Sequence, residues 1–559
     1  MVQTFYTTEL NTLYGPKKAP QVEARLRNLI QQYRGRIPIP PETSLSERDS
    51  ILITYPDQVR QAGQPHLKTL FRFCEDWLLG VVKGIHILPF FPWSSDDGFS
   101  VMDYRKVDPE LGSWEDIEHL SQKFRLMIDG VINHISAESE WFKGFLANES
   151  PYRKYFFTVD GHPDLSNVVR PRTTPLLTEF QTRSGSRRVW TTFSTDQIDL
   201  DYHNPEVLLE IFDILLMYAT HGARFIRLDA IAYLWKEIGT NCIHLPQTHA
   251  FIRLLRNVLD DVAPYVQLVT ETNVPHKENI SYFGDGSNEA QLVYNFALPP
   301  LVMHTLLTGD ASILSEWAAG LKLPSDQTTF FNFLASHDGI GLNPARGILS
   351  PKEMDNLVAQ TISHGGLISY KHNSDGSQTP YEMNINYFDA LSNPAGAEPI
   401  TLQVKRFMAA QAIMLSLIGV PGIYFHSLFG SRNWTEGVKL TKHNRAINRE
   451  KLDSSSLEDE LSNPHSLRSL VYRQYCQLLR QRAGSSAFHP HGRQKIINMG
   501  KNIFAILRNS PAGDKQVLCL QNVTAEPQSS GSYNLEPYQT LWIDQPRSTS
   551  SEKVILTKY

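Results

Sequence analysis

The sequence predicts an α/β protein, a closed (β/α)8 barrel with inserted loop subdomains and a small C-terminal antiparallel β domain. The first observation is that eight short apolar runs alternate with helical patterns, which is typical of parallel βαβ units in a barrel. The second is that two connections after these runs are too long for ordinary loops. The third is a change after about residue 491 to short strands separated by Gly, Pro, Asn and Ser.

The N-terminal part, residues 1–50, is expected to be a helical extension of the barrel. It holds one amphipathic helix candidate, Val22–Tyr33, followed by a proline-rich connector at Ile37–Pro41. From residue 51 the strand-like runs begin, each short, apolar and separated from the next by a helical pattern. The eight runs are Ile51–Tyr55, Gly84–Pro89, Arg125–Asp129, Phe225–Asp229, Val266–Glu271, Leu292–Phe296, Thr329–Leu334 and Gly422–Phe425.

The barrel is expected over residues 51–490, with insertions at about 135–205 and 342–396. Long connections in compact domains are usually functional lids or small inserted domains. Both insertions follow predicted strands, so we expect them on the carboxyl-terminal face of the barrel, where barrel enzymes keep their sites. A helical pattern from Leu467 to Leu478 should close the barrel, and the β domain is expected over residues 491–559.

Composition describes a soluble globular protein and excludes several other classes. Of 559 residues, 41% are apolar and 20% charged, and the net charge of −5 argues against a nucleic-acid partner, which usually needs a basic face. The charge-free segment Phe407–Phe425 is broken at Gly419–Gly422, so we interpret it as a buried helix, a turn and a strand and expect no membrane span. No signal-peptide pattern is evident, and four scattered cysteines favour a reducing, cytoplasmic setting.

One stretch, Gly222–Tyr233, gives the first indication of chemistry. Alternation places Arg227 and Asp229 on the same side of a strand, because side chains two residues apart share a face. A neighbouring guanidinium lowers the pKa of a carboxyl, and the ionised form is the one that a carboxylate nucleophile needs. A structural Arg–Asp pair inside a parallel sheet explains this stretch equally well. Other parts of the sequence must therefore distinguish a structural pair from a catalytic one.

Polar residues also follow other predicted strands. Asp129 precedes Asn133 and His134, Glu271 ends another run, and His337–Asp338 follows a third. Any one acid at a strand end could be a helix cap. Several clusters at successive strand ends instead indicate a single site on the carboxyl-terminal face of the barrel.

These clusters resemble the four signature regions of glycoside hydrolase family 13, the α-amylase family, within a match over about residues 51–490. The matching residues are Asp129–His134, Arg227–Asp229, Glu271 and His337–Asp338. Asp96–Phe99 and Asp229–Thr240 further resemble the sucrose-phosphorylase-like branch, and within it the members that act on glucosylglycerate. The resemblance implies a retaining double displacement with Asp229 as nucleophile, Glu271 as general acid/base and Asp338 as transition-state stabiliser.

The resemblance also implies binding residues. Those implied for the substrate are Asp96, Phe99, His134, Arg227, Tyr233, His337, Glu382 and Arg445, and those implied for phosphate or the acceptor are Arg172, Tyr381 and Arg445. Phosphate needs fixed cationic donors, which the planar guanidinium of Arg172 would supply. Alternatively, any single histidine or aromatic residue is a satisfied core residue, and Arg170 and Arg172 are solvated loop charges.

Two departures from sucrose phosphorylases bear on the acceptor. Glu382 follows Tyr381 where those enzymes typically carry Gln, and Ala335–Ser336 replaces their usual Asp-Thr. The implied reaction converts 2-O-α-D-glucosyl-D-glycerate and phosphate to α-D-glucose 1-phosphate and D-glycerate, with Glu382 accepting a hydrogen bond from a glycerate hydroxyl. Three alternatives stay open: phosphorolysis of sucrose or sucrose 6′-phosphate, hydrolysis or transglucosylation of α-glucosides, and non-catalytic carbohydrate binding, which would be expected to lose a catalytic acid.

The resemblance implies no cofactor and no metal, because carboxylates perform the covalent chemistry. Asn133 corresponds to a position that supports calcium in some amylases, but this branch usually lacks the ion. The expected partners are small molecules, namely a glucoside, phosphate and D-glycerate, and the chain is expected to be a monomer or a homodimer.

Overall fold

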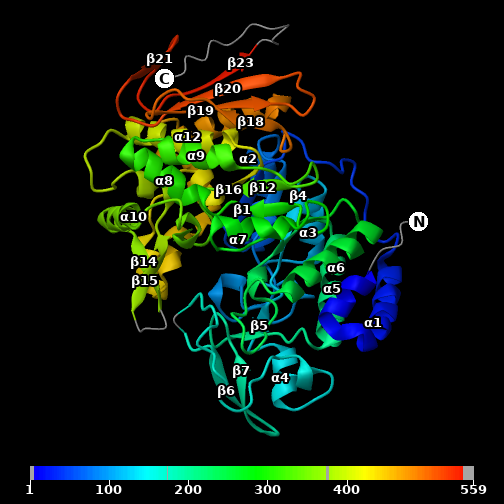
Figure 1. Ribbon diagram of the computed structural model, residues 1–559. Coiled ribbons are helices and arrows are strands. Elements are labelled where there is room, and N and C mark those ends of the chain that lie inside the picture. The colour runs from blue at the N-terminus through cyan, green and yellow to red at the C-terminus, as the bar shows by residue number, and fades with distance from the viewer. Residues whose placement is uncertain (1–5, 173, 373–376, 546–559) are drawn as a thin grey trace.

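Eight parallel strands form a closed barrel in the computed structural model, which describes residues 6–172, 174–372 and 377–545 (Figure 1). Around the barrel the order is β1-β16-β12-β11-β10-β9-β4-β3, and each neighbouring pair is parallel. The strands are β1 Ile51–Thr54, β3 Gly84–Ile87, β4 Arg125–Gly130, β9 Ala223–Leu228, β10 Gln267–Thr270, β11 Leu292–Tyr294, β12 Thr329–Asn332 and β16 Val420–Tyr424. All eight predicted strands are confirmed.

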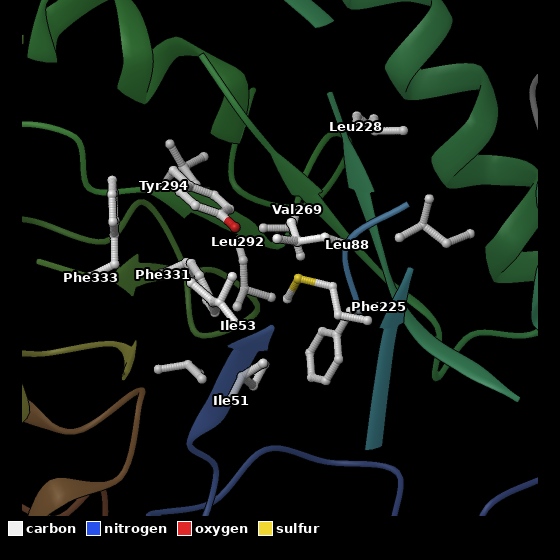
Figure 2. Packing of buried hydrophobic residues seen from close by; sticks show 14 of the residues in the cluster. Ile51, Ile53, Leu88, Phe225, Leu228, Val269, Leu292, Tyr294, Phe331 and Phe333 are labelled. Atoms are coloured by element: carbon white, nitrogen blue, oxygen red, sulfur yellow. The ribbon is translucent and has the colours of Figure 1, made fainter. Parts of the chain in front are cut away.

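The barrel interior is a packed apolar core. Ile53, Val269 and Phe331 are buried, and Figure 2 shows side chains from different strands meeting there. Nearly every strand residue is buried, because the helices cover the outer face while the inner face fills the barrel. This is why the strands appear in the sequence as continuous apolar runs rather than alternating ones.

Helices cover the barrel and begin at recognisable caps. Asn204 accepts a hydrogen bond from the N–H of Glu206, so the helix α5 begins at Pro205, where a missing N–H costs nothing. The charge-free segment forms the buried helix α12 followed by β16, and the predicted closing helix lies within α16, so both predictions are confirmed. The main covering helices are α2 His66–Leu78, α3 Trp114–Ser121, α5 Pro205–Thr220, α6 Pro246–Val262, α8 Leu298–Thr308, α9 Ser312–Gly320, α12 Ile400–Ser416 and α16 Leu467–Ala483.

The N-terminal helix α1, Tyr6–Tyr33, is longer than the predicted Val22–Tyr33. Its backbone breaks helical geometry at Gly15, whose φ is 74°, and Pro16 then opens the second part. Proline is tolerated at a first helical position, so Pro16 does not end the helix here. The hydroxyl of Tyr33 donates to Asp213 over 2.6 Å, which joins α1 to the barrel helix α5.

Two long segments follow β4 and β12 and lie away from the C-terminal sheet (Figure 1). The first contains β5 His134–Ser136 paired with β8 Gln197–Asp199, the helix α4 Glu140–Leu146, and a hairpin of β6 Leu177–Thr182 and β7 Gly185–Trp190. The second contains the helix α10 Pro351–Ser363 and a sheet of β13 Ile340–Gly341, β15 Gln378–Asn384 and β14 Leu367–His372. These segments supply walls of the cavity described below.

The C-terminal region forms an antiparallel sheet in the order β18-β19-β20-β23, which confirms the predicted β structure there. Its strands are β18 Arg493–Ile496, β19 Ile503–Asn509, β20 Gln516–Asn522 and β23 Thr540–Gln545, beside a small hairpin of β21 Gln528–Ser530 and β22 Tyr533–Leu535. Buried Arg508 donates to the carbonyl oxygen of Ser416 over 2.9 Å, which anchors the sheet to α12. Within the described part of the chain, no helix is both long and apolar enough to cross a bilayer.

Candidate active site

A cavity of about 670 Å³ lies where the barrel strands end, between the two long segments. Of the thirteen residues predicted for the site, eleven line it: Asp96, Phe99, His134, Arg172, Asp229, Tyr233, Glu271, His337, Asp338, Tyr381 and Arg445. The barrel contributes residues after β3, β4, β9, β10 and β12, and the long segments contribute Arg172 and Tyr381. The structure therefore brings together side chains up to 349 positions apart, Asp96 to Arg445.

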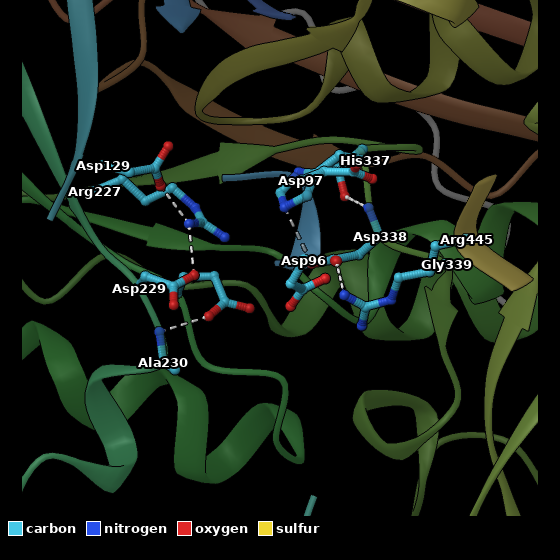
Figure 3. A network of polar contacts seen from close by, with 12 residues as sticks. Asp96, Asp97, Asp129, Arg227, Asp229, Ala230, His337, Asp338, Gly339 and Arg445 are labelled. Atoms are coloured by element: carbon cyan, nitrogen blue, oxygen red, sulfur yellow. Dashed lines mark hydrogen bonds and ion pairs between the residues drawn. The ribbon is translucent and has the colours of Figure 1, made fainter. Parts of the chain in front are cut away.

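Arg227 lies beneath the cavity, fully buried, and bonds two carboxylates (Figure 3). Its Nη1 donates to Asp229 Oδ1 over 2.9 Å and also to Asp129, which in turn contacts the imidazole of His86 over 2.7 Å. Burial acts to raise the pKa of Asp129, but His86 and Arg227 outweigh it and lower that pKa to about 2. Asp129 therefore balances much of the charge of Arg227, a role that the sequence motif did not reveal.

Two opposing effects act on the pKa of Asp229. Burial raises the pKa of Asp229 above its usual value, while Arg227 and His134 act to lower it. The sequence argument, which considered only the guanidinium, expected a lowered pKa; the structure corrects this, because removal of the carboxyl from water is the larger effect. Arg227 limits the increase and orients the carboxylate through the bond to Oδ1.

Glu271 is held by the backbone next to Asp229. Its Oε2 accepts a hydrogen bond of 2.9 Å from the N–H of Ala230. Ala230 has a φ of 48°, an uncommon left-handed conformation for a non-glycine residue. Burial raises the pKa of Glu271 to about 7, with the charges of Asp229 and Asp338 adding to the increase and Arg227 opposing it. Glu271 can therefore carry a proton close to neutral pH.

The pKa of Asp338 is shifted in the opposite direction to that of Glu271. Burial acts to raise its pKa, but the guanidinium groups of Arg445 and Arg449 outweigh burial and hold the pKa well below the usual range. Asp338 forms an ion pair with Arg445 (Figure 3). It also lies 3.7 Å from Arg449 Nη2. Glu271 and Asp338, two acids in one cavity, thus favour different protonation states. Such a difference is expected where one carboxyl group donates a proton and another acts as an anion.

Aromatic and imidazole rings line one wall. The rings of Phe99 and His337 stack with centroids 4.7 Å apart and planes 3° from parallel. Burial holds the pKa of His337 well below its usual value, so this imidazole is neutral. The Nε2 of His134 lies 2.9 Å from the carbonyl oxygen of Phe99, which fixes the position of that ring against the same wall.

Glu382 is not among the cavity-lining residues, which corrects the prediction that it contacts the acceptor. Tyr381 and Glu382 are consecutive residues of β15, and Tyr381 is the extra residue at a register shift in the pairing of β14 with β15. Tyr381 lines the cavity, whereas Glu382 is fully buried and bonded to Arg445 and to the N–H of Gly339. The sequence argument assigned both side chains to the binding site.

Several residues in or beside the cavity were missed by the sequence argument. Arg449 donates to Asp97 over 2.6 Å and to the carbonyl oxygen of His337 over 2.7 Å, and its spacing of four from Arg445 was the one available signal. Gln197 and Phe193 line the cavity from the first long segment, where no sequence pattern marks them. Asn273, two residues after Glu271, also lines it.

A second cavity of about 1680 Å³ adjoins the first and shares Arg172, Asp96 and Arg445 with it. Arg445 pairs with Asp338, and Arg449 pairs with Asp97. By contrast, no carboxylate among the described residues pairs with Arg172, which lies at the junction of the two cavities. Arg170 lines neither cavity and donates to the carbonyl oxygen of Thr174.

Asn133 corresponds to a position that supports calcium in some amylases, and in this structure it lies next to a lysine. The Nζ of Lys236 lies 2.8 Å from Asn133 Oδ1 and 2.7 Å from Asp199 Oδ2, and all three side chains are buried. The ammonium thus supplies positive charge between these oxygen atoms. In the part of the chain that the structure describes, no group of three or more His, Cys, Asp or Glu side chains could hold a metal ion.

Comparison with known proteins places this geometry in context. A family model described as "Alpha amylase, catalytic domain" matches residues 78–338. The chain is 51% identical to a glucosylglycerate phosphorylase of Spirochaeta thermophila, over 92% of this chain and 88% of that protein. It is 51% identical to a glucosylglycerate phosphorylase of Allomeiothermus silvanus, over 96% of this chain and 97% of that protein. The solved structure of a sucrose 6F-phosphate phosphorylase from Thermoanaerobacter thermosaccharolyticum is similar with a TM-score of 0.76 and 26% identity, over 91% of this chain and 98% of that one.

Proposed function

Because this chain belongs to the α-amylase family, glycoside hydrolase family 13, we propose that it is a retaining glycoside phosphorylase acting on glucosylglycerate. The reaction converts 2-O-α-D-glucosyl-D-glycerate and phosphate to α-D-glucose 1-phosphate and D-glycerate. High identity to relatives bearing that name, over nearly the whole chain, supports this substrate. The structural observation that favours phosphate over water as the attacking group is Arg172, a cation at the cavity junction with which no carboxylate of the described residues pairs.

In the first step, Asp229 attacks the anomeric carbon and Glu271 gives its proton to the departing glycerate oxygen. The pKa of about 7 supports this assignment, because Glu271 still holds its proton near neutral pH. Arg227 orients Asp229 by the bond to Oδ1, and the strongly ionised Asp338 would stabilise the positive charge that develops on the sugar.

In the second step, phosphate attacks the anomeric carbon of the β-glucosyl-enzyme from the side that glycerate has left, and the bond from that carbon to Asp229 breaks, which frees the carboxylate. Glu271, now ionised, accepts the proton of the phosphate as that oxygen bonds to carbon. Two inversions at the same carbon retain the α configuration in glucose 1-phosphate. We assign Arg172 and Tyr381 to hold the phosphate, and the same guanidinium would hold the glycerate carboxylate when phosphate is absent.

The glucosyl group would occupy the first cavity. Asp96 and Arg445 line it and can bond sugar hydroxyls, while Phe99 and Tyr233 offer apolar ring faces to the pyranose. We further infer a cytoplasmic enzyme, a monomer or homodimer, since Cys74, Cys242, Cys476 and Cys519 are all free thiols.

Phosphate dependence of turnover tests the proposal. The purified protein is incubated with 2-O-α-D-glucosyl-D-glycerate with and without phosphate, while D-glycerate release and the anomeric form of the sugar product are followed. We expect rapid release only with phosphate, and α-D-glucose 1-phosphate in equal amount. Equal release of D-glycerate without phosphate would identify a hydrolase, and a β-configured product would contradict the double displacement.

A further inference from the structure

Arg445 is held between two carboxylates, the fully buried Glu382 and the half-buried Asp338, at the junction of the cavities. Its Nη2 donates to Glu382 Oε1 over 2.8 Å and its Nε lies 3.2 Å from Glu382 Oε2, which makes a bidentate pair. Its Nη1 forms the ion pair with Asp338 that Figure 3 shows. A guanidinium bonded on both sides in this way has a fixed position, because rotation would break a charged hydrogen bond.

Glu382 is also fixed to the backbone beside Asp338. Its Oε1 accepts a hydrogen bond of 2.9 Å from the N–H of Gly339, the residue that follows Asp338. The contact is close because Gly339 has no side chain; a Cβ there would meet Glu382 Cγ at 2.6 Å. Strand pairing maintains this approach, since Gly341 of β13 is the register partner of Glu382 in β15.

Glu382 is therefore linked to Asp338 by two routes, through the side chain of Arg445 and through the backbone of Gly339. It lines neither cavity and is fully buried, so it has no surface with which to touch an acceptor. Its negative charge also balances that of Arg445, which leaves Arg172 as the cation at the junction without a carboxylate partner among the described residues.

We propose that Glu382 is a positioning residue that locks Arg445 against Asp338, and that it acts on glucosyl transfer to every acceptor rather than on acceptor recognition. The proposal rests on the catalytic role proposed above for Asp338, and it assigns recognition of the anionic acceptor to Arg172. A loosened Arg445 would let Asp338 move, and both half-reactions depend on the position of Asp338.

The test uses Glu382→Gln, which keeps the size of the side chain but removes its charge and one acceptor of the bidentate pair. Two reactions are measured: transfer from α-D-glucose 1-phosphate to D-glycerate, and hydrolysis of α-D-glucose 1-phosphate without any acceptor. We expect kcat to fall about tenfold or more, by the same factor in both reactions, with little change in the KM for D-glycerate. An unchanged hydrolysis rate together with a raised KM for D-glycerate would overturn the proposal, because it would show direct acceptor contact.

Asp389→Asn is the matched control. Asp389 is likewise buried, accepts a bond of 2.7 Å from Arg432 and another of 2.7 Å from the N–H of Asn433, and lines neither cavity. We expect this variant to lose thermal stability but to keep its kcat for hydrolysis. An equal loss of kcat in the control would mean that breaking any buried pair has this effect, and the positioning role would be withdrawn.

A double variant tests whether Glu382 acts through Arg445. If it does, Glu382→Gln combined with Arg445→Gln should hydrolyse α-D-glucose 1-phosphate no more slowly than Arg445→Gln alone. Multiplicative losses would show independent roles and contradict the proposal. Hydrolysis needs no acceptor, so this result stands even if D-glycerate proves to be the wrong substrate, and the two failures can be distinguished.

Discussion

At the scale of single residues, Asp229, Glu271 and Asp338 share one cavity but differ in how tightly they hold a proton. The difference comes from their neighbours: the guanidinium groups of Arg445 and Arg449 face Asp338, whereas Glu271 is removed from water beside two carboxylates. The sequence could identify the three acids through the resemblance of their motifs. It could not assign these protonation states, because they depend on burial and on residues distant in the chain, such as Arg445.

The pKa of Glu271 leads to a prediction for the pH dependence. Glu271 must be protonated to release glycerate, and its pKa is raised from the ordinary value to about 7. The active form is therefore present below pH 7 and is lost as the pH rises through 7, so kcat/KM for phosphorolysis should fall about tenfold per pH unit above that point. As a control, α-glucosyl fluoride, whose leaving group needs little protonation, should show no such decline in the first step. A profile for glucosylglycerate that stays flat to about pH 9 would contradict the role of Glu271.

Arg172 gives a second prediction at this scale. Arg172→Ala should weaken the use of phosphate by about 10- to 100-fold, because charge-assisted hydrogen bonds to the anion are lost. Slow hydrolysis of the same glucoside should change little, since water needs no cationic group. Arg170→Ala, two residues away and lining neither cavity, is the matched control and should behave like the unaltered protein. Equal losses of both reactions in Arg172→Ala would instead make Arg172 a structural residue.

At the scale of elements, the predictions of strands and helices succeeded where the segment is apolar. They failed where tertiary contacts determine the extent or the position of a segment. The barrel strands were predictable because both faces of each are buried. The first half of α1 was not, because Gly15 and Pro16 interrupt its pattern while packing on α5 and α6 retains the helix. The positions of Phe193 and Gln197 depend on how a polar insertion folds back over the barrel, and no periodicity records that.

The close approach of β15 to the segment after Asp338 gives a prediction for this element. In Gly339→Ala, the added Cβ would meet Glu382 Cγ at 2.6 Å and the carbonyl oxygen of Met383 at 2.7 Å. The displaced strand should cost about 1–3 kcal/mol of unfolding free energy and should lower turnover as Glu382 moves. Gly320→Ala at the end of α9 adds a methyl group to open space and should be neutral. Thermal unfolding of both variants checks this; equal melting temperatures would show that β15 adjusts without strain.

At the scale of the whole molecule, the closed barrel fixes the acids while the two long segments supply the walls of the cavity that we assign to the acceptor. The C-terminal sheet is anchored to α12 by Arg508, on the part of the molecule away from these segments (Figure 1). The resemblance of motifs in the barrel predicts glucosyl transfer. The acceptor site that we propose depends on Arg172, Tyr381 and the burial of Glu382, which only the folded arrangement of the long segments defines.

The central claim is that the glucosyl group is exchanged between phosphate and D-glycerate. The most direct measurement supplies α-D-glucose 1-phosphate with D-glycerate, D-fructose, fructose 6-phosphate or glycerol, or with water alone, and follows phosphate release. The account predicts that release is fastest with D-glycerate, yields 2-O-α-D-glucosyl-D-glycerate, and is slow with water. Faster release with D-fructose or fructose 6-phosphate would contradict the proposed acceptor, and equal release with water alone would contradict a phosphorylase.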